Sequence, residues 1–510
     1  MTETEETSRP PWSALVPRAW ALFHTRGRVA AMASAVLVVV LLGAASAFAA
    51  TAGGSSCAEG TVEVACPTDP VGPHGGAVSD AFSFAHQPLG EDGSITVRLA
   101  SMTGVVTYPP PDHDEIVPGL APWAKAGVMI KAGTAPGSPY AALMATGEHG
   151  VRMQYDYTED VAGRLGGAAG DAPRWLRLTR SGDDVTGHES ADGRRWTEVG
   201  TAHLPGLPET VQVGMFATSP GDLTLRPVGL GAHLAQTRFT QATAVFEEVR
   251  VEGAADGEWR HTQVGDMGHT DWEKNHRAPG VTEADGAFTV TGSGDIGPVG
   301  TVGGPSVEDA LVGLAPGLLV VLVVAARFAA AGPPPSGRGL AARAVVVGAG
   351  AFAAGLAAAG AATLLGEWIL RSGGAGTAPV PMSAHLGLVA GTAGLFAASA
   401  VFGLAVGALV RRTWAAAVLA PAALLLPYLA AVLPLLPDGA ADHLLRLTPA
   451  AGFAVTQTLR EFPQVVAHYA PSAGYFPLPG WAGLAVLCGY AAALLGLAAL
   501  RSHRAAAPAR

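Results

Sequence analysis

The stretch Arg174–Trp196 reads RWLRLTRSGDDVTGHESADGRRW, and it is the most informative part of the chain for the fold. Apolar and polar residues alternate through its first half, which places Leu176 and Leu178 on one face of a strand. Turn dipeptides follow at 182–183 (Gly-Asp) and 192–193 (Asp-Gly), where glycine and its neighbour tolerate a positive φ. The stretch therefore predicts three short antiparallel strands with one face exposed to water.

This water-facing pattern contrasts with the chain as a whole, in which 49% of the 510 residues are hydrophobic and only 14% are charged. Residues 51–305 carry most of the acidic residues and nearly all of the strand-like alternation, whereas residues 306–500 consist mainly of Ala, Leu, Val and Gly. We therefore expect one β domain outside the membrane and one membrane domain. The net charge of −10 and the lack of a basic stripe argue against a nucleic-acid partner.

Six segments are apolar enough and long enough to cross a bilayer, which takes about 20 residues of helix. They are Ala30–Ala50, Leu311–Ala326 (starting nearer Val307), Ala344–Leu370, Leu386–Val410, Thr413–Leu436 and Trp481–Leu500. Two interpretations of the first segment stay open, because ASAFAA resembles a signal-peptidase site while the apolar length favours a retained helix. Three prolines should kink the fifth segment.

The arginines predict the orientation of these segments, because cytoplasmic loops carry an excess of positive charge. They precede the first segment and follow the second, fourth and sixth, at Arg18, Arg26, Arg28, Arg327, Arg338, Arg343, Arg411, Arg412, Arg501, Arg504 and Arg510. We expect a multi-pass cell-membrane protein with both termini in the cytoplasm. Its parts would be a cytoplasmic segment 1–29, a first span 30–50, an extracytoplasmic domain 51–305, a membrane domain 306–500 and a cytoplasmic tail 501–510.

The membrane part contains GGPSVEDALVGLAPGLLVVLVVAARF, RAVVVGAGAFAAGLAAAGAATLLG and, before the last span, LLRLTPAAGFAVTQTLREFPQVVAHYAPSAGYFPLPGWAGLAVL. These stretches resemble type-2 ABC export permeases of actinobacteria in the order of the spans as well as in hydrophobicity. The resemblance implies six helices that form half of a transport path, surrounded by lipid and completed by a second copy or a paired permease. It also implies short external helices at Ala450–Arg460 that partly re-enter the membrane, followed by a loop at Pro463–Pro479.

ATP binding is not expected in this chain, because none of its lysines (Lys125, Lys131 and Lys274) follows a glycine as in a P-loop. The resemblance therefore implies a separate ATP-binding subunit, with no enzyme activity and no cofactor here. Between the second and third spans the family has a charged cytoplasmic helix that contacts the ATPase, whereas this chain has AAAGPPPSGRGLAAR. Coupling to the ATPase would therefore rest on the apolar face of PWSALVPRAWALFH. That stretch is equally consistent with an ordinary membrane anchor. Glu367, the one acid in an apolar run, belongs either to the transport path or to the membrane interface.

The external part contains AGVMIK, GSPYAALM and VQVGMFATS around the opening stretch, and together these resemble the concanavalin-like, laminin-G-like jelly roll. The resemblance implies an antiparallel β-sandwich that in different proteins binds glycans or hydrolyses them. QYDYTE matches the glucanase pattern E-x-D-x-x-E only in part, so no catalytic residue is expected. Ligand-binding candidates, for example for a cell-envelope glycan, are Trp123, Asp156, Glu159 and Trp196, although tryptophans also serve in packing.

Two further features of the external part each have two interpretations. Cys57 and Cys66 follow the first apolar segment and form either a disulfide in an oxidising compartment or two free thiols. Asp112 and Asp114 in PDHDE offer oxygens to calcium, but a solvated acidic loop fits as well, and we expect no metal.

The function that fits these observations best is a permease subunit of an ABC exporter, with a lectin-like external sandwich that recognises a ligand or caps the path. The alternative is a membrane-anchored cell-surface binding protein without transport activity.

Overall fold

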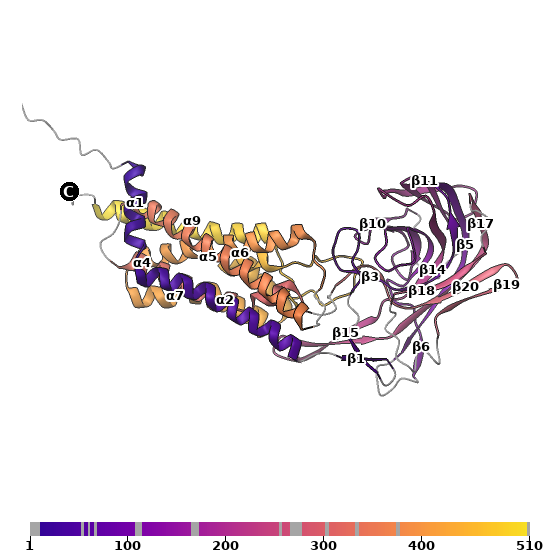
Figure 1. Ribbon diagram of the computed structural model, residues 1–510, viewed down its shortest axis with the longest axis horizontal. Helices are drawn as coiled ribbons and strands as arrows, with labels where there is room; N and C mark the ends of the chain where they lie inside the picture. Colours follow the sequence, from indigo (N-terminus) through magenta and orange to yellow (C-terminus); the bar gives the residue numbers. More distant parts are fainter. Residues whose placement is uncertain are drawn as a thin grey trace, which may run out of the picture.

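The computed structural model describes residues 11–52, 56–59, 62–65, 69–107, 115–164, 173–253, 258–265, 278–300, 305–331, 336–373 and 378–506. It consists of a bundle of helices and a β-sandwich joined end to end (Figure 1). The sequence-based prediction of long apolar helices combined with a large antiparallel β domain is confirmed.

Six helices in the described part of the chain are long and apolar enough to cross a membrane, by length and composition. They are α2 (Arg26–Ala52), the short η1 (Val307–Leu311) continued by α4 (Leu314–Ala330), α5 (Gly337–Ser372), α6 (Met382–Val410), α7 (Thr413–Val432) and α9 (Gly480–Ala506). Each overlaps the apolar segment predicted for it. However, α7 ends at Val432, two residues before Pro434, instead of at Leu436, although it continues through Pro421 and Pro427.

The helices α4 and α6 form the centre of the bundle, since 56% and 61% of their most apolar windows are buried, against 22–39% in the other spans. Small residues let these two helices approach closely. Gly403 and Gly407, one turn apart on α6, face α4, and a Cβ atom on Gly407 would lie 2.1 Å from the carbonyl oxygen of Ala326. The contact between α4 and α6 is therefore one of backbone against backbone.

The described part of the chain also contains four shorter helices: α1 (Trp12–Phe23), α8 (Asp438–Leu447), η2 (Pro449–Thr456) and η3 (Pro471–Ala473). Figure 1 shows α1 across the end of the bundle that is far from the sandwich. The residues Pro449–Val455 of η2 are all buried, and η2 packs against α6, α7 and α9. Of the segment Ala450–Arg460, predicted to form short helices that partly re-enter the membrane, the part up to Thr456 is a buried 3-10 helix and the rest is an irregular loop.

The sandwich has two large antiparallel sheets. The sheet nearer the bundle, called the proximal sheet here, has the order β10 (Glu159–Ala162), β9 (Val151–Tyr155), β8 (Tyr140–Thr146), β7 (Lys125–Lys131), β14 (Val211–Thr218), β4 (Phe82–Leu89) and β18 (Arg260–Val264). The distal sheet has the order β13 (Thr197–His203), β12 (Asp184–Ser190), β11 (Arg174–Ser181), β5 (Asp92–Thr107), β17 (Thr240–Glu252), β20 (Ala287–Gly292) and β19 (Gly280–Ala284), with β6 (Ile116–Pro118) paired to β5. The described residues of the sandwich also form three two-stranded sheets: β1 (Ser56–Glu59) with β2 (Val62–Ala65), β15 (Asp222–Gly229) with β16 (Ala232–Arg238), and β21 (Ile296–Pro298) with β3 (Val78–Asp80).

The stretch Arg174–Trp196 forms the predicted antiparallel strands β11 and β12, whereas the third strand, β13, begins just after it at Thr197. Leu176 and Leu178 are fully buried in the core between the two sheets. Gly182 and Gly193 occupy the turns with φ values of 60° and 71°, where glycine avoids the steric cost of a side chain. The alternation of the sequence thus places one face of this ribbon in the core.

The sandwich and the bundle are held together by several hydrogen bonds. The Ala77 amide donates to the Pro379 carbonyl at 3.0 Å, and the Gly231 amide donates to the Pro434 carbonyl at 3.0 Å. The Gln464 side chain donates to the carbonyl of Thr158 at 3.3 Å. Loops of the bundle therefore contact the β9–β10 turn, the segment before β3 and the β15–β16 hairpin.

Candidate functional site

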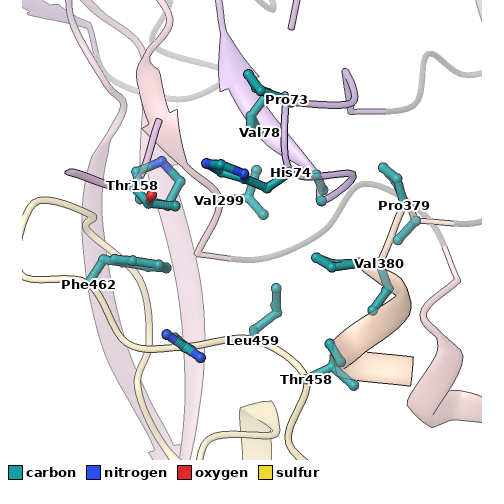
Figure 2. A pocket seen from close by; sticks show the side chains of 18 of the residues that line it. Pro73, His74, Val78, Thr158, Val299, Pro379, Val380, Thr458, Leu459 and Phe462 are labelled. Carbon is teal, nitrogen blue, oxygen red and sulfur yellow. The ribbon is translucent and has the colours of Figure 1, made fainter. Parts of the chain in front are cut away.

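A cavity of about 570 Å³ lies between the sandwich and the end of the bundle. The sandwich contributes Gly72, Pro73, His74, Gly76, Ala77, Val78, Asp156, Thr158, Glu159, Pro298 and Val299, and the bundle contributes Ser306, Ala378–Pro381, Ser383, Ala384 and Thr458–Arg460 with Phe462. Figure 2 shows labelled side chains from both parts around it. Its volume lies within the range typical of small-molecule sites, roughly 300–1,000 Å³.

The walls of the cavity are mainly apolar, with a few ionisable groups. Val78, Val299 and Leu459 supply apolar surface, and Asp156 and Glu159 bring two carboxylates from one hairpin. This mixture suits a molecule with an apolar body and one or more hydrogen-bond donors or a positive charge.

Asp156 is the most unusual polar group of the cavity. Its side chain is only 16% exposed, and its Oδ2 atom lies 3.8 Å from Nε2 of His74. Its Oδ1 atom is buried, and no group in the described part of the chain donates a hydrogen bond to it. Because buried polar atoms normally have a partner, this oxygen is suited to accept a hydrogen bond from a bound molecule.

The backbone around Asp156 is also unusual. Asp156 and Tyr157 join β9 to β10 with φ values of 46° and 65°, a region that costs energy for residues other than glycine. Behind the turn, the Lys131 ammonium donates hydrogen bonds to Oδ2 of Asp80 and to the Tyr157 hydroxyl, each at 2.8 Å. The Tyr157 hydroxyl donates to the same Asp80 oxygen at 2.8 Å. This buried network fixes Tyr157 and holds the strained turn at the cavity.

Tyr157 remains a hydrogen-bond donor in this network, because burial and the charge of Asp80 raise its pKa far above the ordinary value. Burial lowers the pKa of Lys131, while the neighbouring Asp80 carboxylate opposes that shift. Lys131 and Asp80 are both fully buried, so each charge depends on the other.

Two of the four ligand-binding candidates, Asp156 and Glu159, thus lie together at the cavity, and the other two lie elsewhere. Trp123 is 7% exposed, and its ring stacks on that of His149 at 3.9 Å, which is a packing role. Trp196 is half-buried at the distal sheet, with the Arg177 guanidinium 4.0 Å above its ring.

Glu367 lines a second, smaller cavity of about 160 Å³ between α2, η1 and α5. Its carboxylate accepts a hydrogen bond from Arg371 at 2.8 Å and lies 3.4 Å from Nδ1 of His385. Glu367 is therefore paired, and its role in a transport path stays a prediction.

The remaining sequence-based candidates lie outside what the structure describes. Of Cys57 only the backbone within β1 is described, and Cys66 is not described. Asp112 and Asp114 are also outside the described residues. The disulfide and the calcium loop therefore stay predictions.

Sequence reasoning missed most of the cavity wall. The segment before β3, the 378–381 segment and the 458–462 segment meet only in the folded chain, and each is short and without a motif. The three glycines and one proline in Val71–Gly76 were the one local signal of an irregular segment there.

Comparisons with known proteins leave the family open. No family model matches the chain, and no curated protein matches it. A functionally unknown protein from Saccharomyces cerevisiae is 17% identical over 33% of this chain and 72% of that chain, with a TM-score of 0.20. The GH43 protein BlXynB from Bacillus licheniformis is 15% identical over 32% of this chain and 28% of that chain, with a TM-score of 0.19. Scytalido-glutamic peptidase is 6% identical over 42% of this chain and 98% of that chain, with a TM-score of 0.26. Likenesses at these TM-scores carry no argument about this chain.

We expect the Asp156→Asn variant to be more stable than the wild type at pH 7. Burial, aided by Glu159 and opposed by His74, raises the pKa of Asp156. A raised folded-state pKa adds stability below the unfolded-state pKa, and this is lost as the pH rises through the folded-state value. Ionised Asp156 is therefore unfavourable at pH 7, and asparagine removes the charge and tolerates the positive φ.

Urea-dependent pulse proteolysis of the full-length protein at pH 7 and pH 3 would measure this difference. The gain should be present at pH 7 and absent at pH 3, where the wild-type carboxyl is protonated in both states. A loss of stability at pH 7 would show that the carboxylate is held by favourable contacts.

Proposed function

We propose that the chain is the permease subunit of an ABC-type export system and that its sandwich recognises the exported molecule as it leaves the bundle. One observation carries this proposal: the cavity is built jointly by the sandwich and by loops at the end of the long apolar helices. A surface-binding module has no need for a site shared with the membrane part. A molecule leaving the bundle at this end would reach the cavity first.

The polar groups of the cavity favour recognition over a purely structural cap. Asp156 keeps a buried oxygen free of protein donors in the described residues, and its turn is strained. Both features cost stability and are typical of binding sites rather than of packing interfaces. The proposed ligand class is an amphipathic molecule with a cationic or hydroxyl group.

The opposite end of the bundle offers a surface for the ATP-binding subunit that the proposal requires. Ala19 and Phe23 of α1 are buried, and the Phe23 ring packs edge-on against Phe328 at 5.4 Å. Trp12 and Trp20 are 48% and 49% exposed. One face of α1 thus anchors it while two tryptophans remain available to a partner, and exposed aromatics are favoured at such contacts.

Purification of the tagged full chain from its native membranes should recover a P-loop ATPase in stoichiometric amount. The complex should hydrolyse ATP, and the chain alone should not. Replacing both Trp12 and Trp20 by alanine should lower the recovered ATPase by more than about tenfold, the loss expected when an aromatic anchor is removed. Trp481→Ala is the matched control, because Trp481 is 78% exposed at the start of α9, near the sandwich, and should leave recovery unchanged.

The second candidate function, a membrane-anchored surface-binding protein, is favoured by the prolines Pro333–Pro335, which replace the charged cytoplasmic helix of the permeases. It predicts no stoichiometric ATPase and no effect of the two α1 tryptophans. Recovery of the chain without an ATPase from cross-linked native membranes would support this alternative and contradict the exporter proposal.

A further inference from the structure

Three side chains of metal-ligating type from distant parts of the sequence meet where the sandwich contacts the bundle. His233 belongs to β16 of the sandwich, Asp438 is the first residue of α8, and His468 lies in the loop before η3. One ligand atom of each lies within 4.8 Å of those of the other two. Figure 1 shows β15, the partner of β16, on the side of the sandwich that faces the bundle.

The distances in this cluster fit a single bound ion. Oδ2 of Asp438 lies 3.0 Å from Nε2 of His468 and 3.7 Å from Nδ1 of His233. In a tetrahedral zinc site with bonds of about 2.0–2.1 Å, neighbouring ligand atoms are about 3.3–3.4 Å apart. The two separations bracket this value, and the third pair of ligand atoms, on His233 and His468, lies within 4.8 Å.

An ion pair between Asp438 and His468 alone does not explain why His233 lies beside them. Nδ1 of His233 is buried and makes no hydrogen bond within the described residues. The two imidazole rings lie 5.4 Å apart in an edge-to-face arrangement, a contact that leaves this nitrogen without a hydrogen-bond partner. A buried ring nitrogen without a partner is costly, and a metal ion would satisfy it.

We propose that His233, Asp438 and His468 bind one Zn²⁺ ion. Two imidazole nitrogens and one carboxylate oxygen form a donor set that suits this ion better than Mg²⁺ or Ca²⁺, which prefer oxygen ligands. Asp438 lies in the first turn of α8, where the helix dipole favours a negative charge. Three protein ligands leave a fourth position for water.

The ion would fasten the β15–β16 hairpin to the turn between α7 and α8. The hairpin already touches this turn, since the Gly231 amide donates to Pro434 and Gly231 packs directly on the Leu436 carbonyl. Zinc would link His233 of the sandwich to Asp438 and His468 of the bundle. This inference does not depend on the proposed transport function.

The test uses metal-depleted full-length protein in nanodiscs, titrated with ZnCl₂ against a chromogenic zinc indicator. The wild type should bind one Zn²⁺ per chain. The His233→Asn and His468→Asn variants should bind at least about tenfold more weakly, since even the loss of a group that only supports a ligand costs about 10–100-fold. His443→Asn is the matched control, because His443 lies on α8, is exposed and is outside the cluster.

Two measurements on the wild type keep the proposal testable if the variants fold poorly. X-ray absorption at the zinc edge should show imidazole scattering, and hydrogen exchange of residues 232–238 should slow when Zn²⁺ is added. Binding of equal strength in the wild type and both variants, a zinc spectrum with oxygen ligands only, or no stoichiometric binding would each overturn the assignment.

Discussion

The Asp80→Asn variant is expected to lose about 3–5 kcal/mol of sandwich stability, the usual effect of removing one partner of a buried ion pair. Asp80 and Lys131 are both 0% exposed, so the Lys131 ammonium would be left without a counter-charge in the protein interior. The Gly137 amide, 2.7 Å from Oδ2 of Asp80, and the Tyr157 hydroxyl would lose a charged acceptor as well. A domain with a typical stability of about 5–15 kcal/mol would then be partly unfolded in mild denaturant.

Pulse proteolysis of the full-length protein in urea, read from cleavage within the sandwich, measures this loss. Glu247→Gln is the matched control, because Glu247 pairs with Arg98 on the surface, where the two side chains are 40% and 31% exposed. Exposed pairs are worth about 0–1 kcal/mol, so the control should unfold close to the wild type. Equal urea midpoints for the two variants would show that the buried pair is not a structural anchor.

The second large effect is expected in the bundle, where Gly407→Ala should prevent α4 and α6 from packing. The added Cβ atom would lie 2.1 Å from the carbonyl oxygen of Ala326, and a backbone atom cannot move aside as a flexible side chain can. Overpacking usually costs about 1–3 kcal/mol, and here two central helices must separate to relieve it. We expect a strong loss of monodisperse protein in fluorescence-detected size-exclusion chromatography and a lower unfolding temperature.

The same substitution elsewhere on α6 should behave in the opposite way. At Gly387 a Cβ atom would meet nothing within 4 Å, so Gly387→Ala adds helix propensity without a clash. Alanine favours a helix over glycine by about 1 kcal/mol, so this variant should be at least as stable as the wild type. If both alanine variants gave wild-type yields, the proposed close contact between α4 and α6 would be wrong.

The general architecture could be predicted because it depends on local patterns. The alternation around Leu176 and Leu178 predicted buried strand faces, and these side chains are in the core. Likewise, long apolar runs predicted each long helix, while α7 ends at Val432, earlier than hydropathy alone suggested. In both cases the decisive information lies within a few residues.

The site was only partly predictable because its wall is assembled from segments far apart in the sequence. Asp156 and Glu159 were identified together, since one hairpin carries both. Residue type did not reveal that Trp123 is covered by His149, because burial depends on neighbours across the sheet. The meeting of His233 with Asp438 and His468 depends on how the sandwich docks on the bundle, which no local pattern encodes.

The position of the sandwich between α2 and η1 also sets an order of assembly during synthesis. The ribosome makes α2, then residues 53–306, and only then the helices against which α2 packs. At about 5–20 residues per second this interval lasts roughly 13–50 s, whereas β-sandwiches fold in milliseconds to seconds. The sandwich therefore has time to fold before its neighbouring helices exist, and the shared cavity closes last, when the loop at 458–462 emerges. A chain can display that cavity only once synthesis has passed Phe462, so a product truncated before this loop lacks it.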